Sequence, residues 1–495
     1  MNRRRAAAAL VVVIVALGLL VGDDAIARVG GGQSFGSGSS GRSSGGSSGG
    51  FSSGGGSGDG DALFMLLWLL INYPAVAIPL LIVLLVGYVA MRSTKARDRS
   101  GVRTPPPPPR ADPWAAVRRA DPAFSAPVFL DFFQLLHRRA TEGAVRGSPH
   151  PFVSPEAQSR LGALHAGVTA VAQVVCARID VQSARVRDGR VFVDVLVADS
   201  RLERTADGER RVYVEESWTL ARAADAVSPE PDRIRRLACP TCGSAAETDT
   251  AGACRSCGTR LDDGRVMWRV ESVSFPVQRR ALPAPEYAPA PGGIEPGYTL
   301  PTVKAGDLPR KVRALTERHG GFAWPAFEEK VGSTYLSLQR AWSAGAPDGL
   351  RPFVTDNLYQ TLRFWIERYA GAGLRNRLDD VHLLRTEVTD IDLDPWYTAV
   401  TVRIWGSMLD TVVTQDGRVV GGNADSPRKF SEYWTFLRAA GGPATSHTDA
   451  RCPSCGAPLD RVDPAGVCGY CEARITTGEH DWVLSRIEQA EARDG

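Results

Sequence analysis

Eight of the nine cysteines of the chain fall into two sets, and each set consists of two C-x-x-C pairs. The inner cysteines are separated by 11 residues in the first set and by 12 in the second. Two C-x-x-C turns together offer four thiolates, and a tetrahedral sulfur site of this kind selects zinc. The sequence therefore predicts two zinc ions, each held by four cysteines: Cys239, Cys242, Cys254 and Cys257 in the first set, and Cys452, Cys455, Cys468 and Cys471 in the second.

The predicted zinc sites are structural, because four thiolates fill the coordination shell and leave no open position for a substrate. We expect zinc to stabilise two small ribbons that cannot bury a core of their own. These are the first Cys module, residues 238–259, and the second Cys module, residues 451–473. Gly243, Gly258 and Gly456 each follow a cysteine, where such a turn needs a positive φ or additional room.

The sequence carries no H-E-x-x-H motif, no G-x-S-x-G motif and no Walker loop. The ninth cysteine, Cys176, opens an apolar strand-like segment with no nearby histidine, and we predict that it is a small buried apolar residue. We therefore predict that the protein is not an enzyme. The alternative is a cavity within a sheet that binds a small molecule or carries out a reaction.

The part of the chain after residue 120 reads as two copies of one domain. "FSAPVFLDFFQLLHRRA" from Phe124 is similar to "FAWPAFEEKVGSTYLSLQRAW" from Phe322, and "EESWTLARAA" is similar to "SEYWTFLRAA". Each Cys module follows the second of these segments, and a tryptophan in an apolar run follows each module, Trp268 or Trp482. Because the landmarks keep their order, we predict a tandem duplication that already included the Cys module.

Each copy is predicted to be an α+β domain. Phe129, Phe132, Phe133 and Leu136 recur at helical spacing, and the later segments alternate apolar and polar residues as half-buried antiparallel strands do. Helices followed by strands favour helices packed on one face of a curved antiparallel sheet. The expected boundaries are a first domain at residues 121–276, a Pro-rich linker at 277–318 and a second domain at 319–490.

The first 120 residues differ from the rest in composition. Residues 1–27 have the pattern of a signal peptide, with an uncleaved signal anchor as the alternative. Residues 28–61 are a Gly/Ser-rich segment that we expect to be a disordered linker. Residues 62–91 are predicted to form a transmembrane helix that contacts the lipid bilayer through residues 63–91, and residues 92–120 are a basic and Pro-rich linker.

The charges after the predicted span indicate its orientation. Arg92, Lys95, Arg97 and Arg99 follow it directly, and the positive-inside rule places this flank in the cytoplasm. Free thiolates also need a reducing compartment. We therefore expect a single-pass protein whose C-terminal domains are cytoplasmic. The net charge of +3 offers no broad basic field, so nucleic acid is an unlikely partner in this interpretation.

The order of a signal peptide, "RVGGGQSFGS", a transmembrane helix and the strands "EESWTLAR" and "SEYWTFLR" resembles bacterial proteins with a Tim44-like domain. These are relatives of the membrane-anchor subunit of the mitochondrial inner-membrane import motor. The resemblance implies two tandem cystatin-like (nuclear-transport-factor-two-like) domains and a place in the bacterial inner membrane. This chain departs from the usual form in having two copies, each with an inserted zinc ribbon.

The resulting hypothesis is a membrane-anchored cytosolic scaffold or adaptor. It would bind a protein partner or the membrane surface. The resemblance further suggests a part in protein translocation or envelope biogenesis.

Overall fold

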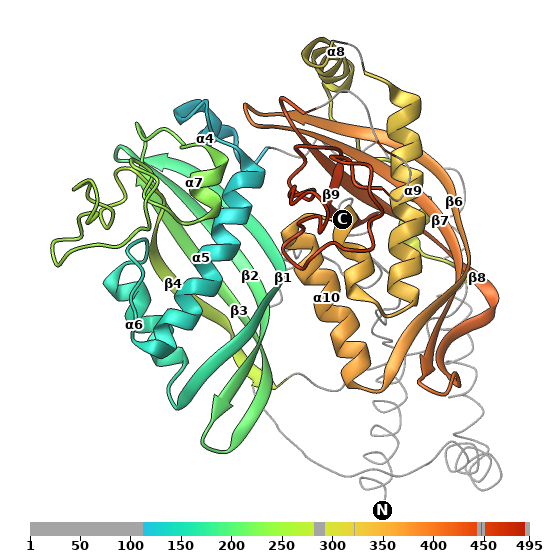
Figure 1. Cartoon of the computed structure of the whole chain (residues 1–495), viewed down its shortest axis with the longest axis horizontal. Coiled ribbons are helices and arrows are strands. Elements are labelled where there is room, and N and C mark those ends of the chain that lie inside the picture. Colours follow the sequence, from blue (N-terminus) through green and yellow to red (C-terminus); the bar gives the residue numbers. More distant parts are fainter. Residues whose placement is uncertain (1–111, 282–292, 321, 443–446, 448–450, 491–495) are drawn as a thin grey trace, which may run out of the picture. The chain divides into compact units, whose positions relative to one another are not determined.

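The computed structural model describes residues 112–281, 293–320, 322–442, 447 and 451–490 (Figure 1). All of these belong to one compact unit of the chain. The predicted signal peptide, Gly/Ser-rich linker and membrane helix, which together make up residues 1–91, lie outside the described residues. In the ranges that are described, no helix is both long and apolar enough to cross a membrane.

The first region, residues 112–281, places helices before an antiparallel sheet in which neighbours in sequence are neighbours in space (Figure 1). The strand order is β1-β2-β3-β4. The elements are α4 (Ala115–Ala120), α5 (Ala126–Arg146), α6 (Pro155–Leu164), β1 (Val168–Arg187), β2 (Arg190–Thr205), β3 (Gly208–Ala223), α7 (Pro231–Arg235) and β4 (Arg269–Ala281).

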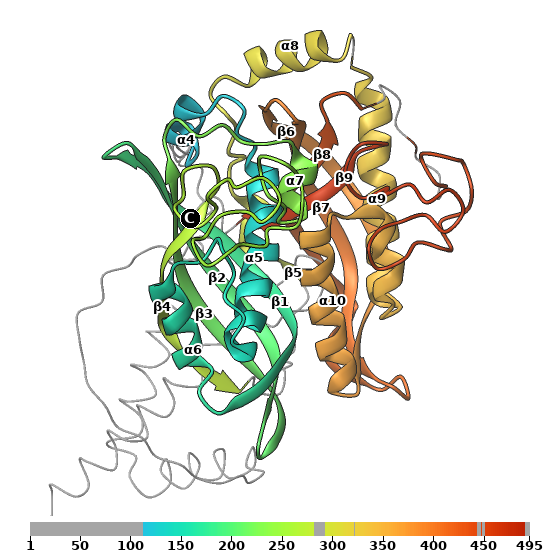
Figure 2. The ribbon, with the colours of Figure 1, turned by 60° about the vertical axis from the view of Figure 1, so that its left-hand side comes forward.

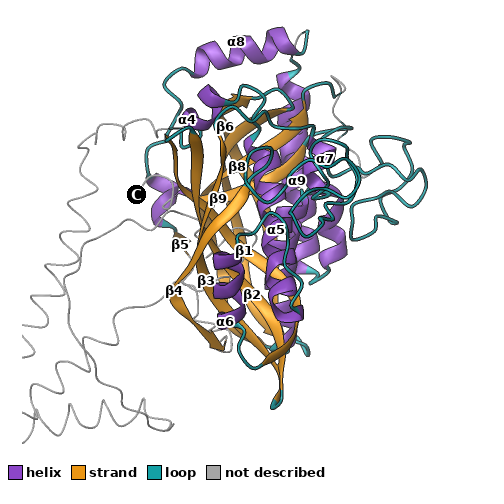
Figure 3. Ribbon diagram, turned by 90° about the vertical axis from the view of Figure 1, so that its left-hand side faces the viewer, coloured by secondary structure: helices purple, strands orange, loops and turns teal. Residues whose placement is uncertain are grey.

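The second region, residues 293–490, also places three α-helices before a run of antiparallel strands and a Cys module before the last strand, but it has an additional short strand and two 3-10 helices, and no helix at the place of α7. Its sheet runs β6-β7-β8, β9 pairs with β8, and the short β5 also pairs with β8. In Figure 3 the helices cover the sheets as a separate layer. The elements are β5 (Gly293–Ile294), η1 (Pro296–Thr299), α8 (Leu308–Arg318), α9 (Trp324–Ser343), η2 (Pro347–Phe353), α10 (Asp356–Gly371), β6 (Leu374–Leu393), β7 (Tyr397–Thr414), β8 (Val419–Ala439) and β9 (Val483–Gln489).

Helix α5 illustrates why these sequences form these elements. The Ser125 hydroxyl accepts a hydrogen bond from the backbone N–H of Val128 and caps the first turn. The apolar residues predicted for one face, Phe129, Phe132, Phe133 and Leu136, are all buried, which confirms that prediction. Burying each such side chain stabilises the fold by about 1.5–3 kcal/mol.

The turn between β1 and β2 is formed by an Asp-Gly pair. Asp188 and Gly189 have φ of 51° and 70° and connect Arg187 directly to its partner Arg190. A two-residue hairpin turn needs positive φ at both central positions, and Asp-Gly is among the sequences that tolerate it best.

The strand with the sequence E-x-W-T is held by the same contacts in both regions. Trp218 Nε1 donates to Glu216 Oε2 at 2.7 Å, and Trp434 Nε1 donates to Glu432 Oε2 at 2.8 Å. Both tryptophans are fully buried. The motif that carries the family resemblance is therefore part of the core.

An arginine at the end of the same strand stacks on the tryptophan that follows the Cys module. The guanidinium carbon of Arg222 lies 4.4 Å from the ring centroid of Trp268, and that of Arg438 lies 4.7 Å from the ring centroid of Trp482. Both arginines and both tryptophans are buried. A desolvated cation–π contact of this kind stabilises by about 2 kcal/mol. It joins the chain leaving each module to the strand that precedes the module.

The first region begins earlier than the predicted boundary at residue 121. Residues 115–120, which we expected in the linker, form α4. Trp114 and Val117 are buried in the core, and the Trp114 ring lies 5.1 Å from that of Phe129. We predicted the boundary too late in the chain because the Pro-rich stretch before these residues is typical of a linker.

The predicted linker at residues 277–318 is also shorter than expected. Strand β4 continues to Ala281, and β5 and α8 both lie within the expected linker. Leu308, Val312 and Leu315 in α8 recur at helical spacing, and Leu315 is completely buried in the second core. The prolines near α8 are typical of a linker, so the short amphipathic pattern of this helix was not predicted.

The two regions touch through the turn between β6 and β7. Ser125 Oγ donates to Asp394 Oδ2 at 2.7 Å, and Trp396 Nε1 donates to the backbone oxygen of Ala123 at 3.0 Å. Hydrogen bonds from side chains that are buried or half-buried are worth about 1 kcal/mol each. They order the turn that carries Trp396.

His150, just before α6, makes the stability depend on pH. Burial, together with the positive charge of Arg139, lowers the pKa of His150 from 6.5 to about 4. The unfolded chain therefore binds a proton below pH 6.5 that the folded chain does not bind until about pH 4. The contribution of uncharged His150 to the stability of the folded chain is therefore complete above pH 6.5. It is lost as the pH falls toward 4.

We predict that His150→Asn reduces the loss of stability between pH 7 and pH 5 by about 1–2 kcal/mol. Asparagine can still accept the hydrogen bond that His150 Nδ1 receives from the Phe152 amide. Urea unfolding at both pH values measures the effect, and His382→Asn, at an exposed histidine, is the control. An equal pH dependence in the wild type and His150→Asn would contradict the assignment.

Candidate metal centres and the buried ionic cluster

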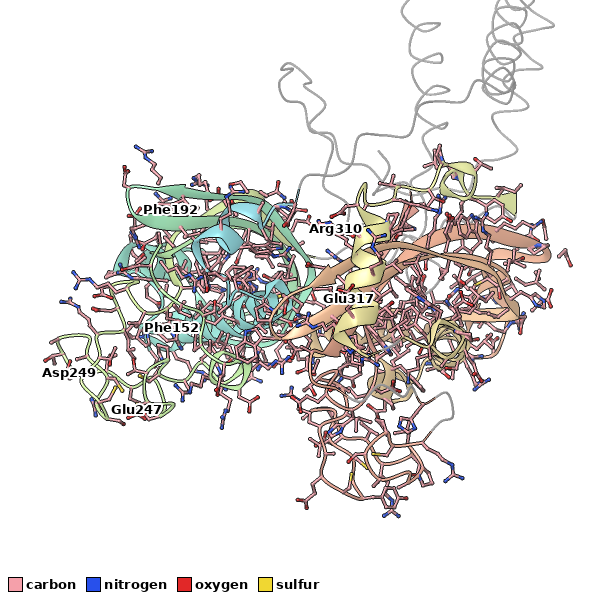
Figure 4. The ribbon with its side chains drawn as sticks, turned by 90° about the horizontal axis from the view of Figure 1, so that it is seen from above. Phe152, Phe192, Glu247, Asp249, Arg310 and Glu317 are labelled. Carbon is pink, nitrogen blue, oxygen red and sulfur yellow. The ribbon has the colours of Figure 1, made fainter. Side chains whose placement is uncertain are left out.

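The structure brings the eight predicted cysteines together as the two predicted sets. In each set the four sulfur atoms lie within 4.8 Å of one another. The first Cys module lies between β3 and β4, and the second lies between β8 and β9. Figure 2 shows both modules as loops outside the sheets, and Figure 4 shows Glu247 and Asp249 in the loop of the first module.

The spacing of the sulfur atoms fits zinc. A tetrahedron with Zn–S bonds of about 2.3 Å has edges of about 3.8 Å. The observed Sγ–Sγ distances are 3.7 Å for Cys239–Cys257, 3.9 Å for Cys242–Cys254 and 3.8 Å for Cys452–Cys471. The donor set and its dimensions are therefore compatible with one zinc ion in each module.

The backbone of each C-x-x-C turn has the conformation that a thiolate site needs. Gly243, Gly258 and Gly456 have φ of 77°, 76° and 75°, as expected, and Glu472 takes φ of 60° at the equivalent position of the fourth turn. The amide of each of these residues donates to the backbone oxygen of the cysteine that opens the turn, at 2.8–2.9 Å. Three glycines and one strained glutamate thus close the four turns.

Backbone N–H groups inside the turns also point at sulfur. Those of Cys257 and Ser256 lower the pKa of the Cys254 thiol to about 6. The N–H of Ala473 is the largest contribution that lowers the pKa of Cys471 to about 7. Each module therefore has a sulfur whose thiolate form is favoured by its own turn, and the thiolate is the form that binds a metal.

The second module is fastened to its sheet by Arg351, whose side chain is buried. Its Nε donates to the backbone oxygen of Pro464 at 2.9 Å, and its Nη1 donates to that of Val354 at 2.9 Å. Gly466 packs so closely here that a Cβ would lie 2.5 Å from Arg351 Nη2 and 2.1 Å from Thr476 Oγ1. The module is thus held closely against the segment between η2 and α10.

A third cluster, which the sequence analysis missed, lies between α5 and the first sheet. It consists of His137, Asp199, Arg201 and Glu216, here called the ionic cluster, and all four side chains are completely buried. His137 Nε2 lies 3.0 Å from Glu216 Oε2 and 3.2 Å from Asp199 Oδ2. Arg201 donates from Nε to Asp199 Oδ1 at 2.8 Å and from Nη2 to Glu216 Oε1 at 2.6 Å.

The charges within the ionic cluster compensate one another. Burial alone lowers the pKa of His137, but its contacts with a thiol and two carboxylates raise that pKa well above the usual value. Burial alone raises the pKa of Glu216, but the charges of Arg201 and His137 lower it below the usual value. The imidazole of His137 and the guanidinium of Arg201 therefore both contact the carboxylates of Asp199 and Glu216.

The ionic cluster does not fit a metal ion. The ligand atoms of His137, Asp199 and Glu216 lie within 4.8 Å of one another, as in a metal site. The guanidinium of Arg201, however, already bridges the two carboxylates. A metal cation would have to approach this fixed positive charge, so the cluster is a buried salt-bridge network.

The prediction that Cys176 has no nearby histidine is wrong. Its side chain is buried, as predicted, but its Sγ lies 3.6 Å from His137 Nδ1. The histidine comes from α5, 39 residues earlier in the chain, and the fold alone brings the two together. The pair is sealed in the interior, and its contacts extend the ionic cluster.

The second region keeps the Glu–Trp pair but replaces the other charged positions. Ile404 pairs with Glu432 as Val197 pairs with Glu216, which aligns β7 with β2. In this alignment apolar and small residues stand where the first region has charges. The correspondences are Gly406 for Asp199, Met408 for Arg201, Leu383 for Cys176 and Tyr335 for His137.

A small cavity lies beside the first hydrophobic core. The cavity, next to Phe124, Phe129 and Trp268, has a volume of about 10 Å³, which is the space of one water molecule. The side chains around it belong to the first hydrophobic core. This cavity cannot hold a substrate.

A comparison with models of known protein families finds a match in the second region. Residues 309–448 match the family model of the Tim44-like domain. The matched segment contains α9, α10 and the strands β6, β7 and β8, and it ends before the second Cys module. The chain therefore contains a Tim44-like domain.

No curated protein matches the chain. Among solved structures, the chain is similar to an "Ntf2 like protein involved in plasmid conjugation" at 9% identity. That match covers 63% of this chain and 78% of the other, with a TM-score of 0.13. A TM-score this low carries no argument about fold or function.

We predict that replacing Cys239 and Cys242 with serine removes one of two zinc ions per chain and makes the first module sensitive to protease, because two ligands no longer close the site. Elemental analysis and limited proteolysis measure the two effects. The matched control is Thr241→Ser, which changes the same turn without touching a ligand. Unchanged zinc content would overturn the assignment.

We predict that Arg201→Met destabilises the protein by about 3–5 kcal/mol, because it leaves two buried carboxylates facing one cation. Arg185→Met, which removes an exposed ion pair with Asp194 from the same sheet, should cost less than about 1 kcal/mol. Urea unfolding compares the two variants.

The residues of the second region supply a further control. Adding His137→Tyr, Asp199→Gly and Cys176→Leu to Arg201→Met should recover much of the lost stability, because most of the buried charge is then gone. A cost for Arg201→Met no larger than that for Arg185→Met would contradict the proposed role of the cluster.

Proposed function

We propose that this chain is a non-enzymatic scaffold that holds a protein partner near a membrane. The observation that carries this proposal is the burial of large aromatic side chains in the hydrophobic cores of both regions. Trp218 and Phe133 in the first core, and Trp434 and Tyr335 in the second, are completely buried where a ligand would otherwise enter. A protein partner would then bind the outer surface of the domains, as in a protein-binding module. The match to the Tim44-like domain supports the same role.

The two regions are, in this proposal, copies of one domain. The similar order of the main helices and strands, the same Glu–Trp pair and the same Arg–Trp stack support it. The second copy, with Tyr335, Gly406 and Met408 at the positions of the ionic cluster, has an uncharged interior at that point except for Glu432. The copies have thus diverged inside while keeping the elements that shape their surfaces.

Each Cys module would hold one zinc ion through its four cysteines, and the ion would cross-link the two turns. The contacts of Arg351 with Pro464 and Val354 would then transmit this rigidity to the sheet. A rigid projecting loop can bind a partner with little loss of conformational entropy. The modules are therefore proposed as part of the binding surface as well as of the fold.

The proposed setting is the bacterial inner membrane. Residues 63–91 would cross it once, and the basic residues 92–99 would keep the following domains in the cytoplasm. Protein translocation or envelope biogenesis is the process that the family resemblance favours. The support for this setting is the sequence of the first 120 residues.

We predict that cross-linking in native membranes, followed by affinity capture of the tagged full-length chain and mass spectrometry, recovers a reproducible protein partner. Replacing Cys452 and Cys455 with serine should reduce its recovery at least several-fold, because the second module loses its fixed shape. Ser454→Ala, in the same turn, is the matched control. Recovery of bulk membrane proteins alone, with no difference between the variants, would count against the scaffold.

A further inference from the structure

A cleft of about 330 Å³ opens where the two regions meet. Its walls come from the start of α7, the turn between β6 and β7, the end of β8 and the segment after the second Cys module. The residues that give it chemical character are Glu230, Asp232, Trp396, Tyr397 and Glu479. Its volume is at the lower end of the range for ligand sites.

The aromatic floor of the cleft is held in place before any ligand arrives. Trp396 Nε1 donates to the backbone oxygen of Ala123 at 3.0 Å. The backbone N–H groups of Trp396 and Tyr397 both donate to Asp394 Oδ1, at 2.8 and 2.6 Å. Two neighbouring rings are thus fixed by both regions, and a preorganised platform loses little entropy on binding.

The rim of the cleft is acidic. Glu230, Asp232 and Glu479 are exposed, and in the described ranges of the chain none of them takes part in an ion pair. They come from separate segments of both regions and converge on the same cleft. Three carboxylates around a small concave surface attract a cation.

Two guanidinium groups that contact the turn of the aromatic floor are engaged by other partners. Arg235 hydrogen-bonds the Tyr397 hydroxyl and pairs with Asp131, with Nε 3.2 Å from Oδ2. Arg318 donates from Nη2 to the backbone oxygen of Asp394 at 2.5 Å. These guanidinium groups are bound by other partners and leave the rim carboxylates for a ligand.

We propose that this cleft binds an arginine side chain presented by an extended segment of a protein partner. A guanidinium is flat enough to stack on an aromatic ring and carries donors that match carboxylates, which the rounder and more strongly hydrated ammonium of lysine does less well. The cleft is open to solvent, so a peptide can place one side chain in it while its backbone continues across the rim. This inference rests on the proposed scaffold function and names the chemistry of the partner.

The test is fluorescence anisotropy with the full-length chain in a non-ionic detergent. The probe is a fluorescein-labelled peptide, Gly-Ser-Gly-Arg-Gly-Ser, and its match is the same peptide with neutral citrulline in place of arginine. The arginine peptide should bind at least ten-fold more tightly, because citrulline keeps the shape but loses the charge. A free arginine amide that binds as tightly as the peptide would overturn the requirement for a peptide partner.

Variants of the rim locate the binding. Glu230→Gln, Asp232→Asn and Glu479→Gln together should weaken the arginine peptide at least ten-fold. The control, Glu156→Gln, Asp207→Asn and Asp425→Asn together, changes the net charge equally at exposed acids outside the cleft and should leave binding within about two-fold. Equal weakening by both sets would mean attraction by overall charge and would overturn the site.

The chain's own basic segment is the competing occupant. Replacing Arg92, Lys95, Arg97 and Arg99 with glutamine should not change the affinity for the peptide. A gain in affinity would show that this segment occupies the cleft and would overturn the partner assignment. If cross-linking still recovers a partner from the rim variants at wild-type levels, this inference fails while the scaffold stands.

Discussion

The contact between an arginine and a tryptophan at the exit of each Cys module is the constraint on which the arrangement of both regions depends. Arg222 on Trp268 and Arg438 on Trp482 join the end of one strand to the start of the next across an insertion of more than 40 residues. A long loop is entropically easy to insert but hard to hold. A buried cation stacked on an aromatic ring must keep its geometry, since exposing either group would give up both the stacking and the packing. The insertion can therefore vary while the last strand of each sheet stays in register.

The Cys modules and the ionic cluster solve related problems in opposite surroundings. A module of about 20 residues can bury only a small hydrophobic cluster, so its turns converge on four sulfur atoms and would be closed by a metal. The ionic cluster lies in an interior that is already packed, and there the two carboxylates are satisfied by Arg201 and His137. The low dielectric of the interior makes the cluster costly to break, because removing one partner leaves an unpaired charge. This difference explains why sulfur ligands occur in the exposed loops and ion pairs occur in the sheet.

The two interiors share one contact and differ around it. Glu216 and Glu432 both accept a hydrogen bond from a tryptophan two residues later, so this contact is kept where the strand must be positioned. Around it, the first region has charges and the second has Tyr335, Gly406 and Met408. Similar outer elements can thus be built on different cores, and the surface where the regions meet need not resemble either one alone. The acidic cleft at Trp396 arises there, from residues of both regions.

By itself, the sequence determined the parts of this protein that depend on neighbours along the chain. These are the two cysteine sets, the amphipathic face of α5, the Asp-Gly turn and the position of each Cys module before the last strand, because spacing and local backbone preference decide them. Tertiary structure alone decided the rest. Val191, Val193, Val195 and Val197 alternate inward along β2, and Asp199 and Arg201 continue the same alternation into the core. This alternation in the sequence was a signal that Asp199 and Arg201 are buried. Only the fold brings His137 and Cys176 to these residues, from elements far away in sequence. The extent of the linkers was likewise settled by burial, since short helices such as α4 and α8 are stable only through packing against a sheet.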